Sequence, residues 1–226
     1  MKRASRLFSD EQRQRIDAAV ASAESKTSAE LVPVVATMSG RYDRAEDIIG
    51  FWCSIAAVVI TLPFLWTPES TTVGDWGAPT IALRICVLVI AMVLAFVFGV
   101  YLGSRTGWLR RLFTPTKEMR DDVDASARKV FFDQRIHHTN EGVGMLFYIS
   151  LYERVATIIA DQRVMERLGQ PVLDQLCTQL TTGLRNGDYT DTLCSVLDQA
   201  GGHLQDVLPR DCNDRNELSD SLVTID

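Results

Sequence analysis

The sequence predicts one α/β domain that is interrupted by two transmembrane helices. Two long apolar runs stand near the middle of the chain, at residues 48–66 and 81–102. Amphipathic helix patterns and short runs rich in β-branched residues lie on both sides of them. Neither side could bury a core alone, because single strands need partners. We therefore expect residues 1–40 and 112–208 to form one domain around a hairpin at residues 48–104.

Composition excludes several classes of protein. The 226 residues carry a net charge of −6, which argues against a nucleic-acid-binding protein, since such proteins are usually basic. The five cysteines are scattered and none has CxxC spacing, so we expect reduced thiols in the cytosol. The charged start, Met1 to Gln14, has no apolar core of a signal peptide, and no cleaved signal is expected.

The two apolar runs have the length and composition of membrane spans. The first run contains no charged residue, and the second contains only Arg84, close enough to its start to reach the interface. At about 1.5 Å per residue, each run can cross the roughly 30 Å hydrocarbon core. A soluble helix is rarely apolar on all its faces over such a length. The lipid bilayer is therefore the first predicted partner.

The distribution of basic residues predicts the orientation of the hairpin. The connecting loop, residues 67–80, carries two acidic residues and no Lys or Arg, whereas the outer flanks are basic. Because basic flanks stay in the cytoplasm, we expect the loop outside and both termini in the cytoplasm. The predicted location is the inner, cytoplasmic membrane.

Small residues recur at four-residue spacing in both runs, which places them on one stripe of each helix. Such stripes let two helix backbones approach closely. Packing within the hairpin and packing between two protomers, as a homo-oligomer or a larger membrane complex, both remain open. The stripes are Gly50, Ser54, Ala57 and Thr61 in the first run, and Ala91, Ala95, Gly99 and Gly103 in the second.

The segment before the hairpin predicts one helix and one strand. Ser9 can cap a helix, and Gln12 stands three residues later, as in a capping box. The β-branched run Glu30 to Ala36 indicates a strand. Pro33 within it argues for an edge or irregular position, because proline cannot donate to a strand ladder.

The segment after the hairpin begins with a predicted amphipathic helix over residues 117–134. Its apolar face holds Met119, Val123, Ala127, Val130 and Phe131. A polar loop, residues 136–144, follows. The runs Met145 to Ser150 and Val155 to Ala160 then predict a β-hairpin, because only a short turn joins them.

Two more helices are predicted near the end of the chain. Leucine-rich stripes over residues 172–184 and 193–204 have helical spacing, and Asn186 to Asp188 separates them. The last stretch, residues 209–226, is polar and acidic and is expected to be an extended tail.

This order of elements resembles the TPM domain family, and in particular its membrane-type bacterial branch, which carries an inserted hairpin. The resemblance covers nearly the whole chain and is most specific in ISLYERVATIIAD, residues 149–161. The start FSDEQRQRIDAAVASAESKTSAELVPVV, residues 8–35, also carries it. So does Asn216 to Asp220, which departs from the family pattern at Ser219, where proline is usual. The resemblance implies an α/β/α sandwich and leaves activity open among phosphatase action, divalent-cation binding and assembly of membrane complexes.

A candidate cation site combines the end of the second predicted strand of the β-hairpin with the loop before the first. Asp161 follows Ala160 directly, and in an antiparallel hairpin it would face the loop that contains Thr139, Asn140 and Glu141. These four residues offer the oxygen ligands that Ca²⁺ or Mg²⁺ prefers. Asp161 could equally cap a following helix, and both interpretations stay open.

Other polar groups are assigned to ordinary structure. His137 and His138 have no partner at zinc-ligand spacing and are expected to be loop residues. Glu153 and Arg154 are expected to form a solvated pair at the turn. Asp121 and Asp124 share a helix face from which Asp122 turns away, so this acidic cluster is expected to be solvated.

The sequence contains no nucleophile motif, metalloprotease motif or phosphate-binding loop, so no catalytic residue can be named. Two functions remain. The first is a cation-binding or scaffold module at the cytoplasmic membrane face. The alternative is a divalent-metal-dependent phosphatase acting on phosphate esters, which rests on the family resemblance alone. Whether the protein is an enzyme is left open.

Overall fold

The computed structural model describes residues 3–65, 81–139, 142–211 and 216–226. Within them the chain forms two compact units. One unit combines residues 1–40 with residues 117–226, and the other consists of residues 41–116. Segments on both sides of the hairpin thus share one unit.

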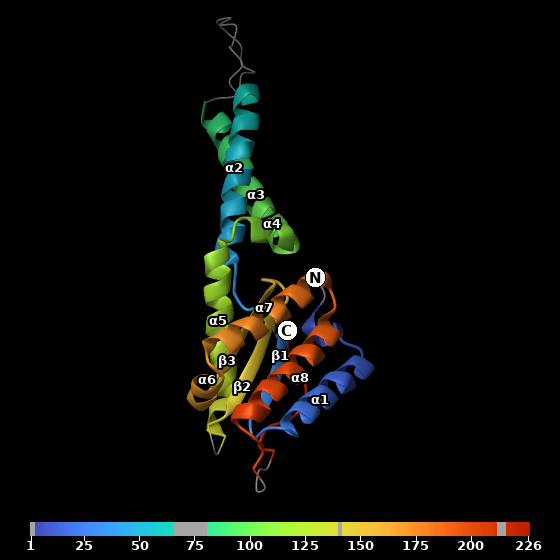
Figure 1. Cartoon of the computed structure of the whole chain (residues 1–226). Helices are drawn as coiled ribbons and strands as arrows, with labels where there is room; N and C mark the ends of the chain where they lie inside the picture. Colours follow the sequence, from blue (N-terminus) through green and yellow to red (C-terminus); the bar gives the residue numbers. More distant parts are fainter. Residues whose placement is uncertain (1–2, 66–80, 140–141, 212–215) are drawn as a thin grey trace, which may run out of the picture. The chain divides into compact units, whose positions relative to one another are not determined.

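A four-stranded mixed sheet forms the centre of the first unit (Figure 1). The strand order is β3-β2-β1-β4. β1 pairs in parallel with both β2 and β4, and β2 pairs antiparallel with β3. The strands are β1 (Glu30–Ala36), β2 (Gly144–Ser150), β3 (Val155–Ala160) and β4 (Val223–Ile225).

The position of β1 differs in part from the expected edge or irregular strand. β1 lies between β2 and β4, but β4 pairs only with Val34, Val35 and Ala36. Glu30 N donates to the Val143 carbonyl on the β2 side, whereas Leu31 N donates to the Glu24 carboxylate. By the alternation of a strand, the nitrogen of Pro33 faces the same way as that of Leu31. Proline is accommodated because no strand among the described residues pairs with β1 there.

Helices cover one face of the sheet and bury most of its core. α1 begins with the expected capping box between Ser9 and Gln12, which satisfies two backbone donors. α1 packs beside α8, and α7 contacts both α8 and β3 (Figure 1). The bounds are α1 (Asp10–Glu24), α6 (Gln162–Leu168), α7 (Gln170–Asn186) and α8 (Tyr189–Val207), with a short 3-10 helix, η1 (Ala4–Arg6), before α1.

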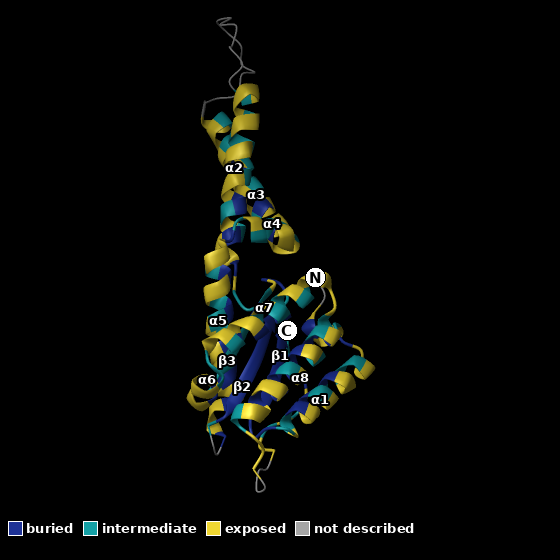
Figure 2. Ribbon diagram, in the orientation of Figure 1, coloured by how far each residue is buried: buried dark blue, intermediate teal, exposed yellow. Residues whose placement is uncertain are grey.

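A single long helix, α5 (Thr116–Asp133), covers the opposite face. Its buried residues are the five predicted from spacing: Met119, Val123, Ala127, Val130 and Phe131. Four of them, all except Met119, form a second core with Val34, Leu146 and Tyr148 of the sheet. The central strands β1 and β2 are buried between the two helical layers (Figure 2), which confirms the predicted α/β/α sandwich.

The tail differs from its expected extended form. Residues 223–225 form β4, which pairs in parallel with the end of β1. Leu222 is buried, and Val223 and Ile225 pack against the α5 side of the sheet. Apolar residues alternating over so short a stretch gave too weak a signal for a strand, so the pairing with β1 decides its structure.

The second unit is an antiparallel pair of long apolar helices. α2 (Asp43–Leu65) packs along α3 (Ile81–Arg105), and a short helix, α4 (Gly107–Leu112), follows. A methyl group added at Gly99 would lie 2.7 Å from the Cα atom of Gly50. Gly103 approaches Ile49 and Glu46 in the same way. The small residues therefore let the two helices of one hairpin pack closely.

Candidate functional site

Asp161 lies where β3 ends, beside the start of β2. The antiparallel register pairs Met145 with Ala160, which brings the next residue, Asp161, to Gly144. Asp161 N donates to the Gly144 carbonyl, and Gly144 N donates to Asp161 Oδ2, each over 2.9 Å. The carboxylate is thus fixed through one oxygen. Asp161 Oδ1 makes no hydrogen bond to any residue that the structure describes.

The backbone of Asp161 starts a helix, but its side chain does not cap that helix. α6 begins at Gln162, and the Asp161 carbonyl accepts from Met165 N over 2.9 Å. Within the described residues, the carboxylate makes no hydrogen bond to the first turn of α6. The side chain turns to Gly144 instead, so capping does not account for the carboxylate.

The loop before β2 approaches Asp161 through two consecutive residues. Thr139 Oγ1 accepts from Val143 N over 3.0 Å, and Gly144 N is the donor to Asp161. Gly142 has a φ of 63°, a conformation that favours glycine. Asn140 and Glu141, the other two predicted ligands, lie outside the described residues. Among the described residues, no group of three His, Cys, Asp or Glu side chains is placed to hold a metal ion.

Burial raises the pKa of Asp161 above its ordinary value. The hydrogen bond from Gly144 and the nearby His137 act in the opposite direction, since both favour the charged carboxylate. His137 and His138 belong to a short 3-10 helix, η2 (Ile136–His138). The His137 ring packs against Phe132 with 4.8 Å between ring centroids. His137 therefore contributes to packing and to the electrostatics of Asp161.

The opposite end of β2 carries a polar network that the sequence did not predict. Glu153 is only 2 % exposed, which contradicts the expected solvated pair with Arg154. Its Oε1 accepts from Ser39 N over 2.9 Å and from Gly40 N over 3.2 Å, and its Oε2 accepts from Ser150 Oγ. The carboxylate thus ties the turn after β2 to the segment after β1.

Hydroxyl groups extend this network into the sheet. Ser39 Oγ donates to Ser150 Oγ over 2.9 Å and lies 3.0 Å from the hydroxyl of Tyr148. Burial raises the pKa of Tyr148, so its phenol stays protonated. Ser39 is more than 100 residues away in the sequence from Tyr148, Ser150 and Glu153. The local sequence indicated this network only through an acidic residue in a tight turn between two buried strands.

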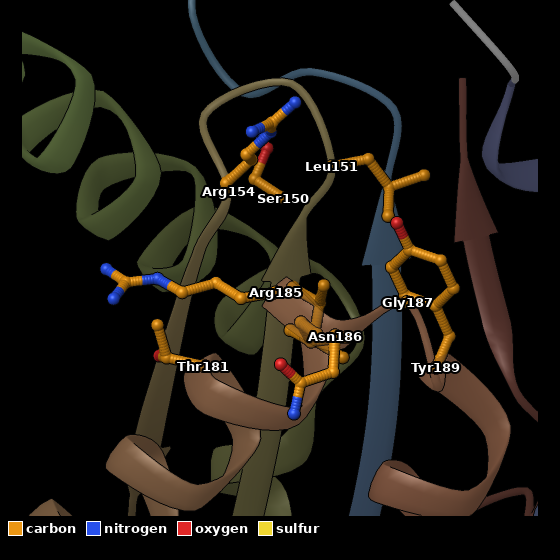
Figure 3. A pocket seen from close by; sticks show the side chains of 10 residues that line it. Ser150, Leu151, Arg154, Thr181, Arg185, Asn186, Gly187 and Tyr189 are labelled. Carbon is orange, nitrogen blue, oxygen red and sulfur yellow. The ribbon is translucent and has the colours of Figure 1, made fainter.

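A pocket of about 270 Å³ opens beside this network (Figure 3). The end of β2 and the turn after it form one wall, and the end of α7 and the start of α8 form the other. Figure 3 shows Arg154 on the turn after β2 and Arg185 near the end of α7. Neither arginine was singled out from the sequence as part of a site.

Comparison with known proteins supports the fold. No protein-family model and no curated protein sequence matches the chain. Among solved structures, the chain is similar to the NMR structure of BA42 protein from the psychrophilic bacterium Bizionia argentinensis. The TM-score is 0.59 at 14 % sequence identity, and the match covers 99 % of each chain. At this identity the similarity shows the fold alone.

These findings define a class of fold. The chain has an α/β/α fold similar to that of BA42 protein. The chain combines such an α/β/α domain with two helices long and apolar enough to cross a membrane.

Proposed function

We propose that this chain is a membrane-anchored TPM-domain protein of the membrane-type branch, whose soluble domain is a cation-binding or assembly module at the cytoplasmic membrane face. The observation that supports the cation site most is the carboxylate of Asp161. One of its oxygens is fixed by Gly144 N, and the other makes no hydrogen bond within the described residues.

The hairpin supports membrane anchoring. Large apolar side chains cover the outer surfaces of α2 and α3, which would be costly in water. Figure 2 shows this exposed surface along both helices. Examples more than half exposed are Phe51, Val59, Ile60, Phe64, Leu94, Val97 and Phe98. Lipid chains would cover this surface.

The proposed orientation rests on the basic flanks and can be tested by labelling. In a variant without native cysteines, single cysteines replace Ser5, Ser70 or Ser219. A membrane-impermeant thiol reagent applied to intact cells should label only the probe at Ser70. As a control, permeabilised cells should allow labelling at Ser5 and Ser219. Labelling of either terminal probe in intact cells would contradict the orientation.

The proposed cation would bind where Thr139 and Asp161 hold Val143 and Gly144. A hard cation prefers carboxylate, hydroxyl and carbonyl oxygens, and the predicted ligands are Asp161, Thr139, Asn140 and Glu141. The carboxylate of Asp161, whose Oδ1 makes no hydrogen bond within the described residues, would supply the negative charge. Because that carboxylate is already oriented by Gly144, binding would require little ordering of the side chain.

Thermal unfolding of the full-length protein in detergent tests this site. Ca²⁺ or Mg²⁺ should raise the melting temperature, because a ligand that binds only the folded state stabilises it by about 2.7 kcal/mol at a concentration 100 times Kd. Asp161→Asn keeps an acceptor for Gly144 N but removes the charge, and should lose most of the rise. Asp206→Asn, a change at an exposed site on α8, is the matched control.

The outcomes distinguish the proposed functions. An equal rise for wild type and Asp161→Asn would place the cation elsewhere, and no rise in either would leave a scaffold without a cation. Cation-dependent hydrolysis of a phosphate ester, lost in Asp161→Asn, would instead favour the phosphatase alternative.

A further inference from the structure

The pocket beside the end of β2 combines positive charge with a defined shape. Arg154 and Arg185 line it, and no Asp or Glu is among its described lining residues. Neither guanidinium forms an ion pair or hydrogen bond with any described residue. Asn186 and Tyr189 also line the pocket and can donate hydrogen bonds. The lining therefore offers donors and positive charge without a counter-ion from the protein.

The backbone at the turn directs Arg154 away from its acidic neighbour. Arg154 has a φ of 56°, a left-handed conformation that costs free energy in a residue with a side chain. Glu153 points instead into the protein, where Ser39, Gly40 and Ser150 donate to it. Consecutive residues of opposite charge are thus separated, which leaves Arg154 available to the pocket.

The location agrees with a general rule for α/β proteins. Ligands bind outside the carboxyl ends of the parallel strands of an open sheet. Ser150 ends β2, pairs with Ala36 at the end of the parallel strand β1, and lines the pocket. Asp161 lies at the other end of β2, roughly 20 Å away along a strand of this length. The pocket and the cation site are therefore separate.

We propose that this pocket binds a phosphate group. Guanidinium groups present paired donors that match phosphate oxygens. Figure 3 shows the two guanidinium groups pointing in different directions, so their flexible side chains must turn towards the pocket to hold one dianionic group together. A pocket of about 270 Å³ suits a small headgroup better than an extended ligand. The apolar side chains of Leu151 and Leu184 in its lining can contact the carbon atoms of a phosphate ester.

Two sources supply this chemistry: free phosphate compounds and the headgroups of anionic phospholipids. The turn that forms one wall is bonded to the segment leading to α2, since Leu151 N donates to the Ala36 carbonyl over 3.0 Å and Tyr152 N to the Thr37 carbonyl over 3.1 Å. From Thr37 the chain runs into the apolar hairpin.

Binding can be measured on the full-length protein with two probes. In a maltoside detergent, which contains no phosphate, inorganic phosphate is titrated by calorimetry. In nanodiscs of phosphatidylcholine, with and without phosphatidylglycerol, the melting temperature of the soluble domain is followed. The variant is Arg154→Gly combined with Arg185→Gln. Arg128→Gln, at an exposed arginine of α5, is the matched control.

The wild-type protein should bind at least one of the two probes. Its affinity for that probe should fall about tenfold or more in the double variant, because each lost charge-assisted contact costs a factor of this order. The Arg128→Gln control should bind like wild type. Calorimetric binding of inorganic phosphate identifies a free phosphate compound as the source, and stabilisation only by phosphatidylglycerol identifies a lipid headgroup.

Arg154→Gly also separates binding from folding. Glycine adopts the left-handed conformation at this turn without strain, so the unliganded single variant should melt no lower than wild type while it binds less tightly. Unchanged affinity in the folded double variant would overturn the proposal. So would the absence of binding to both probes in the wild-type protein.

Discussion

The two units of this molecule are assembled in opposite ways. The hairpin unit consists of one continuous stretch, residues 41–116, and its two long helices follow each other in the chain. The sheet unit joins residues 1–40 to residues 117–226. Its strand β1 comes from the first segment, whereas β2 and β4 on either side come from the second.

Contacts between the two segments are numerous in the sheet unit. Besides the strand pairing, Thr27 Oγ1 donates to the Leu208 carbonyl over 2.6 Å. Near the two chain ends, Ser5 Oγ donates to Asp226 over 2.6 Å. The sheet unit is thus one compact unit built from both segments, with the hairpin inserted between them. Removing one segment should therefore affect the sheet unit far more than the hairpin.

The largest expected effect follows from dividing the sheet unit. Residues 117–226 alone should not fold, because β2 and β4 lose the strand that joins them and α8 loses α1. Residues 1–40 joined to 117–226 by a flexible linker should recover a cooperative unfolding transition. Circular dichroism and urea unfolding measure both. A cooperatively folded 117–226 fragment would show that β1 is dispensable.

The next effect concerns the carboxylate that connects the two segments. Glu153→Ala should destabilise the sheet unit by about 3 kcal/mol, because it leaves Ser39 N, Gly40 N and Ser150 Oγ without their acceptor. Urea unfolding of the full-length protein in detergent measures the change. Glu166→Ala, an exposed residue of α6, should change stability little. Equal effects of the two substitutions on the free energy of unfolding would show that Glu153 does not stabilise the contact between the two segments.

A substitution in the hairpin should destabilise the hairpin unit and leave the sheet unit unchanged. Gly99→Leu should cost about 2 kcal/mol, because even its Cβ atom would lie 2.7 Å from Gly50 and force the helices apart. Hydrogen exchange followed by mass spectrometry should show faster exchange in α2 and α3 and unchanged exchange in the sheet. Val97→Leu, at an exposed position of α3, is the control. Faster exchange in the sheet as well would mean that the units are coupled.

A smaller effect depends on pH at the other end of β1. Burial raises the pKa of Glu24 to about 8, and the carboxylates of Glu30 and Asp220 also raise it. The folded protein therefore holds a proton that the unfolded chain releases near pH 4.5, so stability falls as pH rises from about 4.5 to about 8 and levels off above that range.

Glu24→Gln should remove this dependence, because glutamine stays neutral and can still accept from Leu31 N. The variant should gain stability relative to wild type as pH rises from 5 to 8, by at most about 4 kcal/mol. Urea unfolding at both pH values measures the difference. A constant difference across this range would show that Glu24 titrates normally in the folded protein.

The sequence alone determined the features that depend on local composition and spacing. The apolar runs specify the hairpin, the buried face of α5 follows from helical periodicity, and the short turn predicts the pairing of β2 with β3. Each feature depends on neighbours within a few residues or on one continuous stretch. Because β2 and β3 follow each other in the chain, the sequence also placed Asp161 beside the loop before β2.

Only the tertiary structure decided the features that depend on distant partners. β4 becomes a strand because β1 offers it a free edge, and Pro33 is tolerated inside β1 because β4 stops short of it. Glu153 is buried because Ser39 and Gly40, from the other side of the hairpin, donate to it. The pocket containing Arg154 and Arg185 exists because the turn after β2 meets the end of α7. The burial and hydrogen bonding of a polar side chain depend on which segments surround it, and periodicity along the chain does not contain that information.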